Sequence, residues 1–297
     1  MKAIVFGGSG FVGSHVVDVL FEQGYEVVIF DKKPSPYLRD GMQMVVGDIL
    51  DEKAVCDTIE GADYVYNFAG IADLDAASAT PIASIELNIR GTCNILEACV
   101  RYGVKRLVFA SSFYVNSDKG GFYRCSKQAA EIYIEEYNRR YGQAYTVLRY
   151  GSLYGQRSDE SNGVHRMLKS ALEHGKICFR GTGNETREYI DVLDAAELSV
   201  QILDKKYENK YITLTGHNIF PVKNLFLIIQ EIIGKNIDII YEEADSNIHY
   251  DMTPYTFKPQ CSLKLVGECY RDIGQGLTEC LREIQNDINN SRNGEQD

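Results

Sequence analysis

Lys2-Ala3-Ile4-Val5-Phe6-Gly7-Gly8-Ser9-Gly10-Phe11-Val12-Gly13 is the stretch on which the fold prediction depends. Its apolar run, Ala3 to Phe6, has the length and branching of a buried parallel strand. From Phe11 to Leu20 the apolar residues form the stripe of a helix. The glycines between them are spaced Gly-x-x-Gly-x-x-Gly, and a strand, a glycine turn and a helix in this order indicate a phosphate-binding turn.

Each glycine of this turn has its own physical role. The missing Cβ permits a tight turn at Gly7, lets a pyrophosphate approach the backbone at Gly10, and lets helix and strand pack closely at Gly13. The N–H groups at the start of the helix, at Phe11 and Val12, then face the phosphates. We therefore predict that these residues bind the pyrophosphate of a dinucleotide.

The next strand, Tyr25 to Phe30, ends in an acid. Asp31 stands where a carboxylate accepts hydrogen bonds from an adenosine ribose and repels a 2′-phosphate, which favours NAD over NADP. Lys32 and Lys33 follow at once and are long enough to reach a phosphate, so NADP stays open. Taken alone, Asp31 is also compatible with an ordinary solvated turn.

A third strand, Met42 to Val46, leads into Gly47-Asp48-Ile49. We predict that Asp48 and Ile49 flank the adenine ring. On its own, an Asp after a Gly is more often just a turn.

Composition sets the broad class. The 297 residues are 44% apolar and 25% charged, as in an ordinary globular protein, and the net charge of −11 argues against binding nucleic acid or an anionic membrane. The first strand follows Met1 directly and no apolar run is long enough to span a bilayer, so we expect a cytoplasmic protein. The eight scattered cysteines indicate reduced thiols, and with the five separated histidines they form no metal-ligand pattern.

Strands and helices alternate regularly through the first half of the chain. This rhythm predicts an α/β fold, a Rossmann doubly wound parallel sheet with ligands at the carboxyl ends of its strands, beside a smaller α/β substrate lobe. We expect an NAD-binding domain over residues 1–160, rejoined by 186–216. The substrate-binding lobe is expected over 161–185 and 217–290, followed by a polar tail over 291–297.

A second group of polar residues follows the fifth predicted strand, 106–110. Ser111-Ser112 come first, and then Tyr123 and Lys127 lie one turn apart on the same face of a predicted helix, 123–141. A phenol keeps its proton up to a pKa of about 10, but an ammonium one turn away and a cationic nicotinamide favour the phenolate. Tyr123 then accepts a proton from a substrate hydroxyl whose oxygen Ser112 holds, and Lys127 holds the nicotinamide ribose. Tyr-x-x-x-Lys alone also arises by chance.

These motifs together resemble the extended short-chain dehydrogenase/reductases, and more narrowly the NAD-dependent nucleotide-sugar epimerase/dehydratase branch. The resemblance covers about residues 1–215. Its motifs are the glycine turn, Asn67-Phe68-Ala69-Gly70, Asn88-x-x-Gly91-Thr92-x-Asn94-x-Leu96-Glu97-Ala98, Ser111-Ser112, Tyr123-x-x-x-Lys127, Leu148-Arg149-Tyr150-Gly151-Ser152-Leu153-Tyr154-Gly155 and Gly181-x-Gly183-x-x-Thr186-Arg187-x-x-Ile190-x-Val192-x-Asp194.

The resemblance implies catalysis by Ser112, Tyr123 and Lys127. It implies that the bound NAD is also contacted by a second set of residues, namely Phe68, Ala69, Gly70, Tyr123, Lys127 and Tyr150. The substrate contacts implied are Ser111, Ser112, Ser152 and Arg187, with Arg187 near the diphosphate, although an ordinary salt bridge would also explain this arginine. A homodimer packed through the helices 81–102 and 123–141 is implied as well.

Departures from the family pattern reduce the number of reactions that we expect. Phe113-Tyr114 stands where the dehydratases carry Asp-Glu and where some epimerases carry a Cys, so 4,6-dehydration and epimerisation beside the ketone are not expected. The stretch from Ser112 to Tyr123 is short, and Ser152 replaces the family's Asn. A late Arg-Pro-Gly-Asp-like segment is not visible; Tyr255-Thr256-Phe257-Lys258 occupies its place.

The simplest reaction for these residues is C4 epimerisation of a nucleotide sugar. Net dehydrogenation or ketoreduction at C4 is the close alternative, because the short loop changes the sugar pocket. A non-catalytic dinucleotide sensor is a third reading, against which Tyr123 and Lys127 count. The sequence does not indicate the nucleobase or the sugar.

Overall fold

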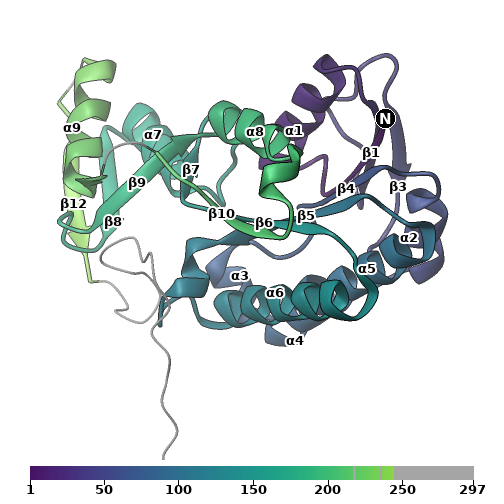
Figure 1. Ribbon diagram of the computed structural model, residues 1–297. Coiled ribbons are helices and arrows are strands. Elements are labelled where there is room, and N and C mark those ends of the chain that lie inside the picture. The colour runs from purple at the N-terminus through teal and green to yellow at the C-terminus, as the bar shows by residue number, and fades with distance from the viewer. Residues whose placement is uncertain (217–218, 235, 244–297) are drawn as a thin grey trace, which may run out of the picture. The chain divides into compact units, whose positions relative to one another are not determined.

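The computed structural model of this chain describes residues 1–216, 219–234 and 236–243. Its centre is a seven-stranded parallel sheet in the order β10-β6-β5-β4-β1-β2-β3 (Figure 1). The strands are β1 (Lys2–Phe6), β2 (Glu26–Asp31), β3 (Gln43–Val46), β4 (Tyr64–Asn67), β5 (Arg106–Ser112), β6 (Tyr145–Tyr150) and β10 (Lys210–Leu214). The strand order reverses at β1, as in a doubly wound fold. The predicted Rossmann-like α/β fold is thus confirmed.

Helices cover both faces of this sheet (Figure 1). One face carries α1 (Phe11–Glu22) and α8 (Val192–Gln201), and the other carries α2 (Glu52–Ile59), α5 (Gly91–Tyr102) and α6 (Gly121–Tyr141). Along β1 the side chains alternate between two cores: Ala3 and Val5 belong to one, Ile4 and Phe6 to the other. The strand is apolar throughout because both of its faces are covered.

The helix predicted from Pro81 to Tyr102 is continuous but not uniform. It consists of α4 (Pro81–Ser84), a π-helical stretch (Ile85–Arg90) and α5. The wider π-helical turn contains Asn88, whose buried side chain bonds the backbone of Ile71. The sequence pattern of a regular helix does not predict these bonds. Three short helical pieces were not predicted, namely α3 (Leu74–Ala79) and the 3₁₀ turns at Phe113–Asn116 and Lys205–Tyr207.

Smaller sheets build a second lobe. β7 (Ser152–Tyr154), β9 (Thr186–Asp191) and β11 (Ile219–Pro221) form one mixed sheet, and β8 (Lys176–Arg180) pairs in parallel with β12 (Asp238–Glu242). α7 (Gly163–His174) and α9 (Val222–Ile233) pack over a core that includes Ile177, Phe226 and Ile229.

The chain crosses three times between the large sheet and this lobe: after β6, after β9 and after β10. Of the predicted segment 186–216, α8 and β10 lie with the large sheet, whereas β9 belongs to the mixed sheet of the lobe. The segment Tyr255–Lys258 and the tail 291–297 lie outside the described residues, and so does most of the predicted segment 217–290.

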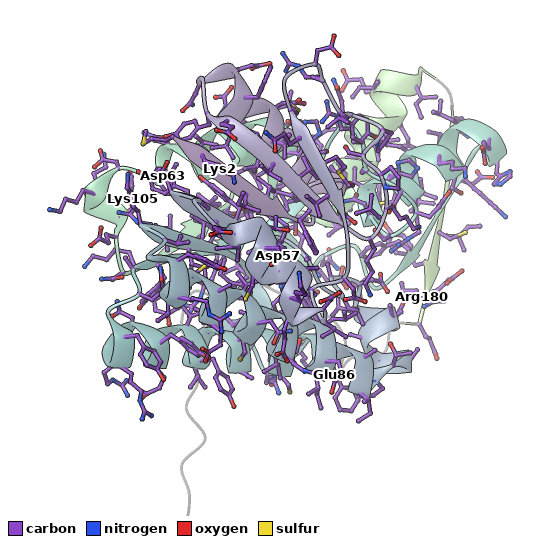
Figure 2. All side chains as sticks on the ribbon, turned by 90° about the vertical axis from the view of Figure 1, so that its right-hand side faces the viewer. Lys2, Asp57, Asp63, Glu86, Lys105 and Arg180 are labelled. Carbon is purple, nitrogen blue, oxygen red and sulfur yellow. The ribbon has the colours of Figure 1, made fainter. Side chains whose placement is uncertain are left out.

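Polar contacts join strands at the end of the sheet where the parallel strands begin. The Asp63 carboxylate accepts the backbone N–H of Lys2 at 2.8 Å and pairs with the Lys105 ammonium at 2.6 Å. Figure 2 shows these three residues together. They link the starts of β1, β4 and β5 because each residue lies within or next to one of those strands.

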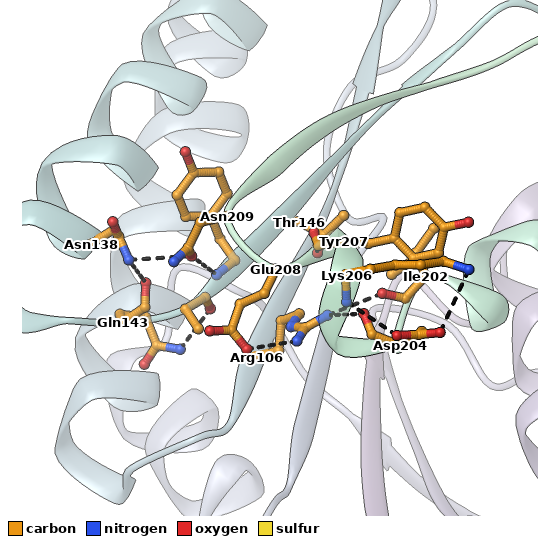
Figure 3. Close-up of polar contacts among 12 residues, drawn as sticks. Arg106, Asn138, Gln143, Thr146, Ile202, Asp204, Lys206, Tyr207, Glu208 and Asn209 are labelled. Carbon is orange, nitrogen blue, oxygen red and sulfur yellow. Dashed lines mark hydrogen bonds and ion pairs between the residues drawn. The ribbon is translucent and has the colours of Figure 1, made fainter.

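A buried arginine attaches the returning segment α8–β10 to the sheet. Arg106, at the start of β5, donates from Nη1 to the carbonyls of Ile202 at 3.0 Å and Asp204 at 3.2 Å. Its Nη2 pairs with the Glu208 carboxylate at 2.8 Å (Figure 3). The Arg106 side chain is only 5% exposed, so these bonds compensate for a desolvated charge.

Candidate cofactor and catalytic site

The glycine turn after β1 has the geometry that its spacing predicts. Gly7 has φ +77°, and a Cβ there would lie 2.6 Å from the Ala69 nitrogen. A Cβ on Gly13 would lie 2.3 Å from the Gly7 oxygen, so the start of α1 packs directly on the turn. Within the described chain no side chain caps this end of α1. The turn therefore presents backbone N–H groups in a form suited to a pyrophosphate.

A cleft of about 230 Å³ opens above this turn. It brings together seven of the predicted cofactor residues: Gly7, Gly10, Asp31, Ile49, Phe68, Ala69 and Gly70. Lys32, which the sequence places within reach of a phosphate, also lines it, and so do three residues that were not predicted as contacts, namely Phe30, Gly47 and Leu87. Leu87 comes from the π-helical stretch, whose apolar pattern is that of an ordinary helix. Phe11 and Val12 begin α1 directly after Gly10.

Asp31 ties the glycine turn to the end of β2. Its Oδ2 accepts the Ser9 backbone N–H at 3.0 Å, and the Ser9 hydroxyl donates to the Lys33 carbonyl at 3.0 Å. A carboxylate has about four acceptor positions, so Asp31 keeps the capacity to accept ribose hydroxyls.

Asp48 pairs with one of the two lysines that leave NADP open. Lys32 Nζ lies 3.1 Å from Asp48 Oδ2, and Asp48 Oδ1 accepts the Leu50 N–H at 2.9 Å. Partial burial acts to raise the pKa of Asp48, but the Leu50 hydrogen bond and the Lys32 ammonium together hold it below its ordinary value. The Lys32 charge therefore already has a carboxylate partner beside the cleft.

The loop after β4 is fixed by asparagine side chains. Asn67 Oδ1 accepts the Ala69 N–H at 3.1 Å, and Asn88 bonds both backbone groups of Ile71, at 2.7 and 2.9 Å. A Cβ on Gly70 would lie 2.2 Å from Asn88 Oδ1. Asn88 also donates to the Ser126 hydroxyl at 2.8 Å. The loop that lines the cleft is thus connected to α6.

On α6 the predicted catalytic pair is buried and adjacent. Lys127 Nζ lies 5.9 Å from the centre of the Tyr123 ring and donates to the Ala110 carbonyl of β5 at 2.9 Å. Tyr123 is 8% exposed and Lys127 5%. Burial lowers the pKa of Lys127 to about 8, partly opposed by the Glu131 carboxylate. The ammonium therefore stands at the carboxyl end of β5, next to the phenol ring.

Ser112 closes β5 and starts the short loop that leads to Tyr123. Its hydroxyl oxygen accepts the Tyr114 N–H at 3.3 Å, which begins the 3₁₀ turn. The Tyr114 ring then meets the Tyr123 ring edge-on, with 6.2 Å between centres. Gly120, at φ +91°, makes room for it, since a Cβ there would lie 2.6 Å from the Tyr114 ring. The short loop therefore packs one tyrosine against the predicted catalytic tyrosine.

Other predicted contacts have partners inside the protein. The Ser111 hydroxyl donates to Glu131 at 2.6 Å, and the buried Tyr150 hydroxyl lies 2.7 Å from Ser199 Oγ. Substrate contact by Ser111 stays a prediction, against which its engaged hydroxyl counts. The Tyr150 ring lies 6.3 Å from that of Phe68, which lines the cleft, so a cofactor contact would come through the ring.

The two remaining predicted substrate residues lie in the second lobe. Ser152 begins β7 and Arg187 lies on the adjacent β9, both half-buried. β7 and β9 pair in parallel, which brings the two residues into one small sheet. Their contact with a substrate stays a prediction.

A larger cleft, of about 400 Å³, lies between β7 and α7. Its described lining is largely apolar and includes Tyr154, Val164, Leu168 and Leu172. Lys169 and His165 also line it. The smaller cleft contains the glycine turn, whose backbone N–H groups suit a pyrophosphate, so the dinucleotide is still expected there. In the part of the chain that the structure describes, no cluster of three metal-binding side chains occurs and no helix is long and apolar enough to cross a bilayer.

The fold and this site define a class. The sequence profile of the NAD dependent epimerase/dehydratase family matches residues 3–213, and the chain belongs to that family. It is an enzyme family that depends on NAD.

Individual relatives point to nucleotide sugars. A Methanocaldococcus jannaschii protein provisionally named UDP-glucose 4-epimerase is 31% identical over 81% of this chain and 85% of its own length. A Bacillus cytotoxicus UDP-N-acetyl-alpha-D-glucosaminuronate decarboxylase is 26% identical over 96% of this chain and 99% of its own.

Two solved structures of epimerases are similar to this chain. The UDP-glucose 4-epimerase of Thermotoga maritima, determined with UDP-glucose, superimposes with a TM-score of 0.77 at 26% identity, covering 86% of this chain and 90% of its own. The Thermus thermophilus UDP-glucose 4-epimerase, in complex with NAD, gives 0.76 at 26% identity, covering 87% and 91%.

Proposed function

We propose that this protein oxidises C4 of a nucleotide sugar with NAD and, by returning the hydride, interconverts C4 epimers. The observation that carries the proposal is the Lys127 ammonium, buried beside the Tyr123 ring at the end of β5. The glycine turn, with the cradle that a Cβ at Gly7 or Gly13 would fill, and the Asp31 carboxylate fit the dinucleotide that the family uses. The nucleotide-sugar class rests on the epimerase relatives.

When bound, NAD accepts a hydride from the carbon that bears the hydroxyl and later returns it. The chain's own residues handle the proton. Tyr123 Oη takes the C4 hydroxyl proton as the C–H bond breaks, and gives it back when the ketone is reduced. Lys127 supplies a positive charge that favours the phenolate, and Ser112 donates a hydrogen bond to the same substrate oxygen. If the 4-keto sugar turns over before the hydride returns, the product is the C4 epimer and no net oxidant is consumed.

One relative favours a second candidate. The Bacillus cytotoxicus protein, which matches nearly the whole chain, is named as a decarboxylase of a uronic acid sugar. Oxidation at C4 of such a sugar makes a ketone β to the C6 carboxylate. The C5–C6 bond then breaks with loss of CO₂, the electron pair forms an enolate, and a proton and the returned hydride complete the product. The same three side chains serve both reactions.

The first experiment adds a panel of neutral and uronic nucleotide sugars to the protein. The nicotinamide absorbance is recorded during each reaction, and the products are then identified. A C4 epimer with no lasting absorbance change supports epimerisation, and CO₂ release from a uronic sugar supports decarboxylation. A lasting absorbance rise with a free ketosugar indicates net dehydrogenation. Bound NAD with no response to any sugar contradicts the proposal and favours a dinucleotide sensor.

Tyr123→Phe tests the catalytic assignment. The change removes only the phenol oxygen, so turnover should fall at least about 10³-fold while NAD remains bound. Tyr141→Phe, at the exposed end of the same helix, is the matched control and should keep wild-type turnover. Full activity in Tyr123→Phe would exclude Tyr123 as the general base.

A further inference from the structure

A buried carboxylate lies directly behind the predicted catalytic pair. Glu131 follows Lys127 by one turn of α6, and the two residues are 6% and 5% exposed. Its Oε1 accepts the Ser111 hydroxyl at 2.6 Å and the Arg149 Nε at 3.1 Å, and its Oε2 accepts Arg149 Nη2 at 2.7 Å. Both carboxylate oxygens are thus held by donors from β5 and β6.

The cluster extends to a third strand. Arg149 Nη1 donates to Asn116 Oδ1 at 3.2 Å, and its guanidinium lies 4.4 Å from the centre of the Tyr211 ring on β10. The Tyr211 hydroxyl donates to Glu135, one turn after Glu131. Glu131 is therefore held directly from β5 and β6, and Arg149, which holds it, is itself packed against β10.

The charges around this carboxylate decide what it does to its neighbours. Lys127 and Arg149 are the cations that face it, and Glu135, Tyr145 and Tyr211 are the other titratable groups nearby. Burial lowers the pKa of Lys127 to about 8, and the Glu131 charge is what opposes this. Without Glu131, a buried lysine in this position would lose its proton nearer to neutral pH.

We propose that Glu131 is a positioning residue that keeps Lys127 protonated beside Tyr123 and, through Ser111, holds the end of the strand that carries Ser112. This inference rests on the proposed function, because it assigns Glu131 a role through Lys127. Ser111 thereby serves the site from inside the protein.

Glu131→Gln tests the inference, because glutamine keeps the size and one acceptor oxygen but removes the charge. The alkaline limb of the pH profile of kcat should move to lower pH by about half a unit or more, with a smaller change in KM. Arg149→Gln breaks the same ion pair but keeps the carboxylate, so its alkaline limb should not move to lower pH. Glu131→Asp keeps the charge, so its alkaline limb should stay at the wild-type pH. Glu136→Gln, on the exposed face of α6, should also leave the limb unchanged.

A second measurement needs no turnover. Between its folded pKa of about 8 and its higher unfolded value, Lys127 binds fewer protons in the folded chain, so stability rises with pH over that range. In Glu131→Gln this rise should begin at lower pH, and in Lys127→Met it should be absent with or without Glu131. Identical unfolding profiles for wild type and Glu131→Gln would overturn the inference. If no sugar is converted, the proposed function fails while this profile still decides the role of Glu131.

Discussion

A single carboxylate at the end of β2 faces the cleft where the adenosine ribose is expected. Asp31 also accepts the Ser9 N–H, so a change that keeps a hydrogen-bonding side chain is preferable to alanine. Asp31→Asn should shift the NAD-to-NADP preference toward NADP by at least about tenfold, which corresponds to about 1.4 kcal/mol, because the charge that repels a 2′-phosphate is lost.

Dissociation constants for the two dinucleotides measure this preference directly. Asp40→Asn, an exposed acid further along the same loop, is the control and should leave the ratio unchanged. An unaltered ratio in Asp31→Asn would mean that Asp31 does not contact the ribose.

The sequence predicts which types of residue lie at the site but not their hydrogen-bond partners. The position of Gly7, Gly10 and Asp31 at one cleft was predictable because it depends on local spacing at the ends of two adjacent strands. The bonds of Ser111 to Glu131 and of Tyr150 to Ser199 join residues far apart in the chain. Which hydroxyl is engaged inside the protein therefore depends on packing, which residue spacing does not reveal.

The first turn of α1 separates two roles for glycine within a single element. A Cβ on Gly13 would lie 2.3 Å from the Gly7 oxygen, whereas one on Gly10 would lie 3.3 Å from it. Gly13→Ala should therefore lower the free energy of unfolding by about 3 kcal/mol, because the backbone must shift. Gly10→Ala should keep the fold and weaken NAD binding at least about tenfold, because the pyrophosphate meets a methyl group.

Chemical denaturation and NAD titration of the two variants distinguish these outcomes. Should Gly10→Ala bind NAD as tightly as wild type, the pyrophosphate does not cross Gly10.

Most elements were predictable because their periodicity and end signals agree. α7, for example, starts after Asn162, whose side chain accepts the N–H groups of Val164 and His165, and ends at Gly175 with φ +64°. The π-helical stretch was not predictable, since its apolar pattern is that of an ordinary helix. Its cause is the tertiary bonding of Asn88.

Arg106 joins the segment between α8 and β10 to the large parallel sheet. Replacing it with methionine leaves two carbonyls and the Glu208 carboxylate without their donor. We expect Arg106→Met to lower the free energy of unfolding by at least about 2 kcal/mol. Lys105→Met, at the neighbouring exposed ion pair, should cost less than about 1 kcal/mol. Equal losses in thermal unfolding would show that burial of the Arg106 contacts carries no special weight.

The homodimer that the family resemblance implies stays a prediction. Large apolar side chains are exposed on the two helical segments that the family resemblance implicates: Ile82 (71%), Ile85 (49%), Ile132 (65%) and Tyr133 (49%). If these segments form the dimer, Ile132→Asp should raise the monomer fraction in sedimentation, whereas Ile232→Asp on α9 should not. A wild-type protein that sediments as a monomer would contradict the prediction.

The pairing of β10 with β6 has a consequence for synthesis. Tyr211 and Leu214 complete the edge of a sheet whose other strands are all made by residue 150. While the ribosome adds the intervening residues, β6 has an unpaired edge that can pair with other nascent chains. The seven-stranded sheet cannot be completed until β7 to β9 and α8, which precede β10 in the chain, have also been synthesised. A premature stop within that interval would therefore yield an aggregation-prone fragment rather than a free-standing cofactor domain.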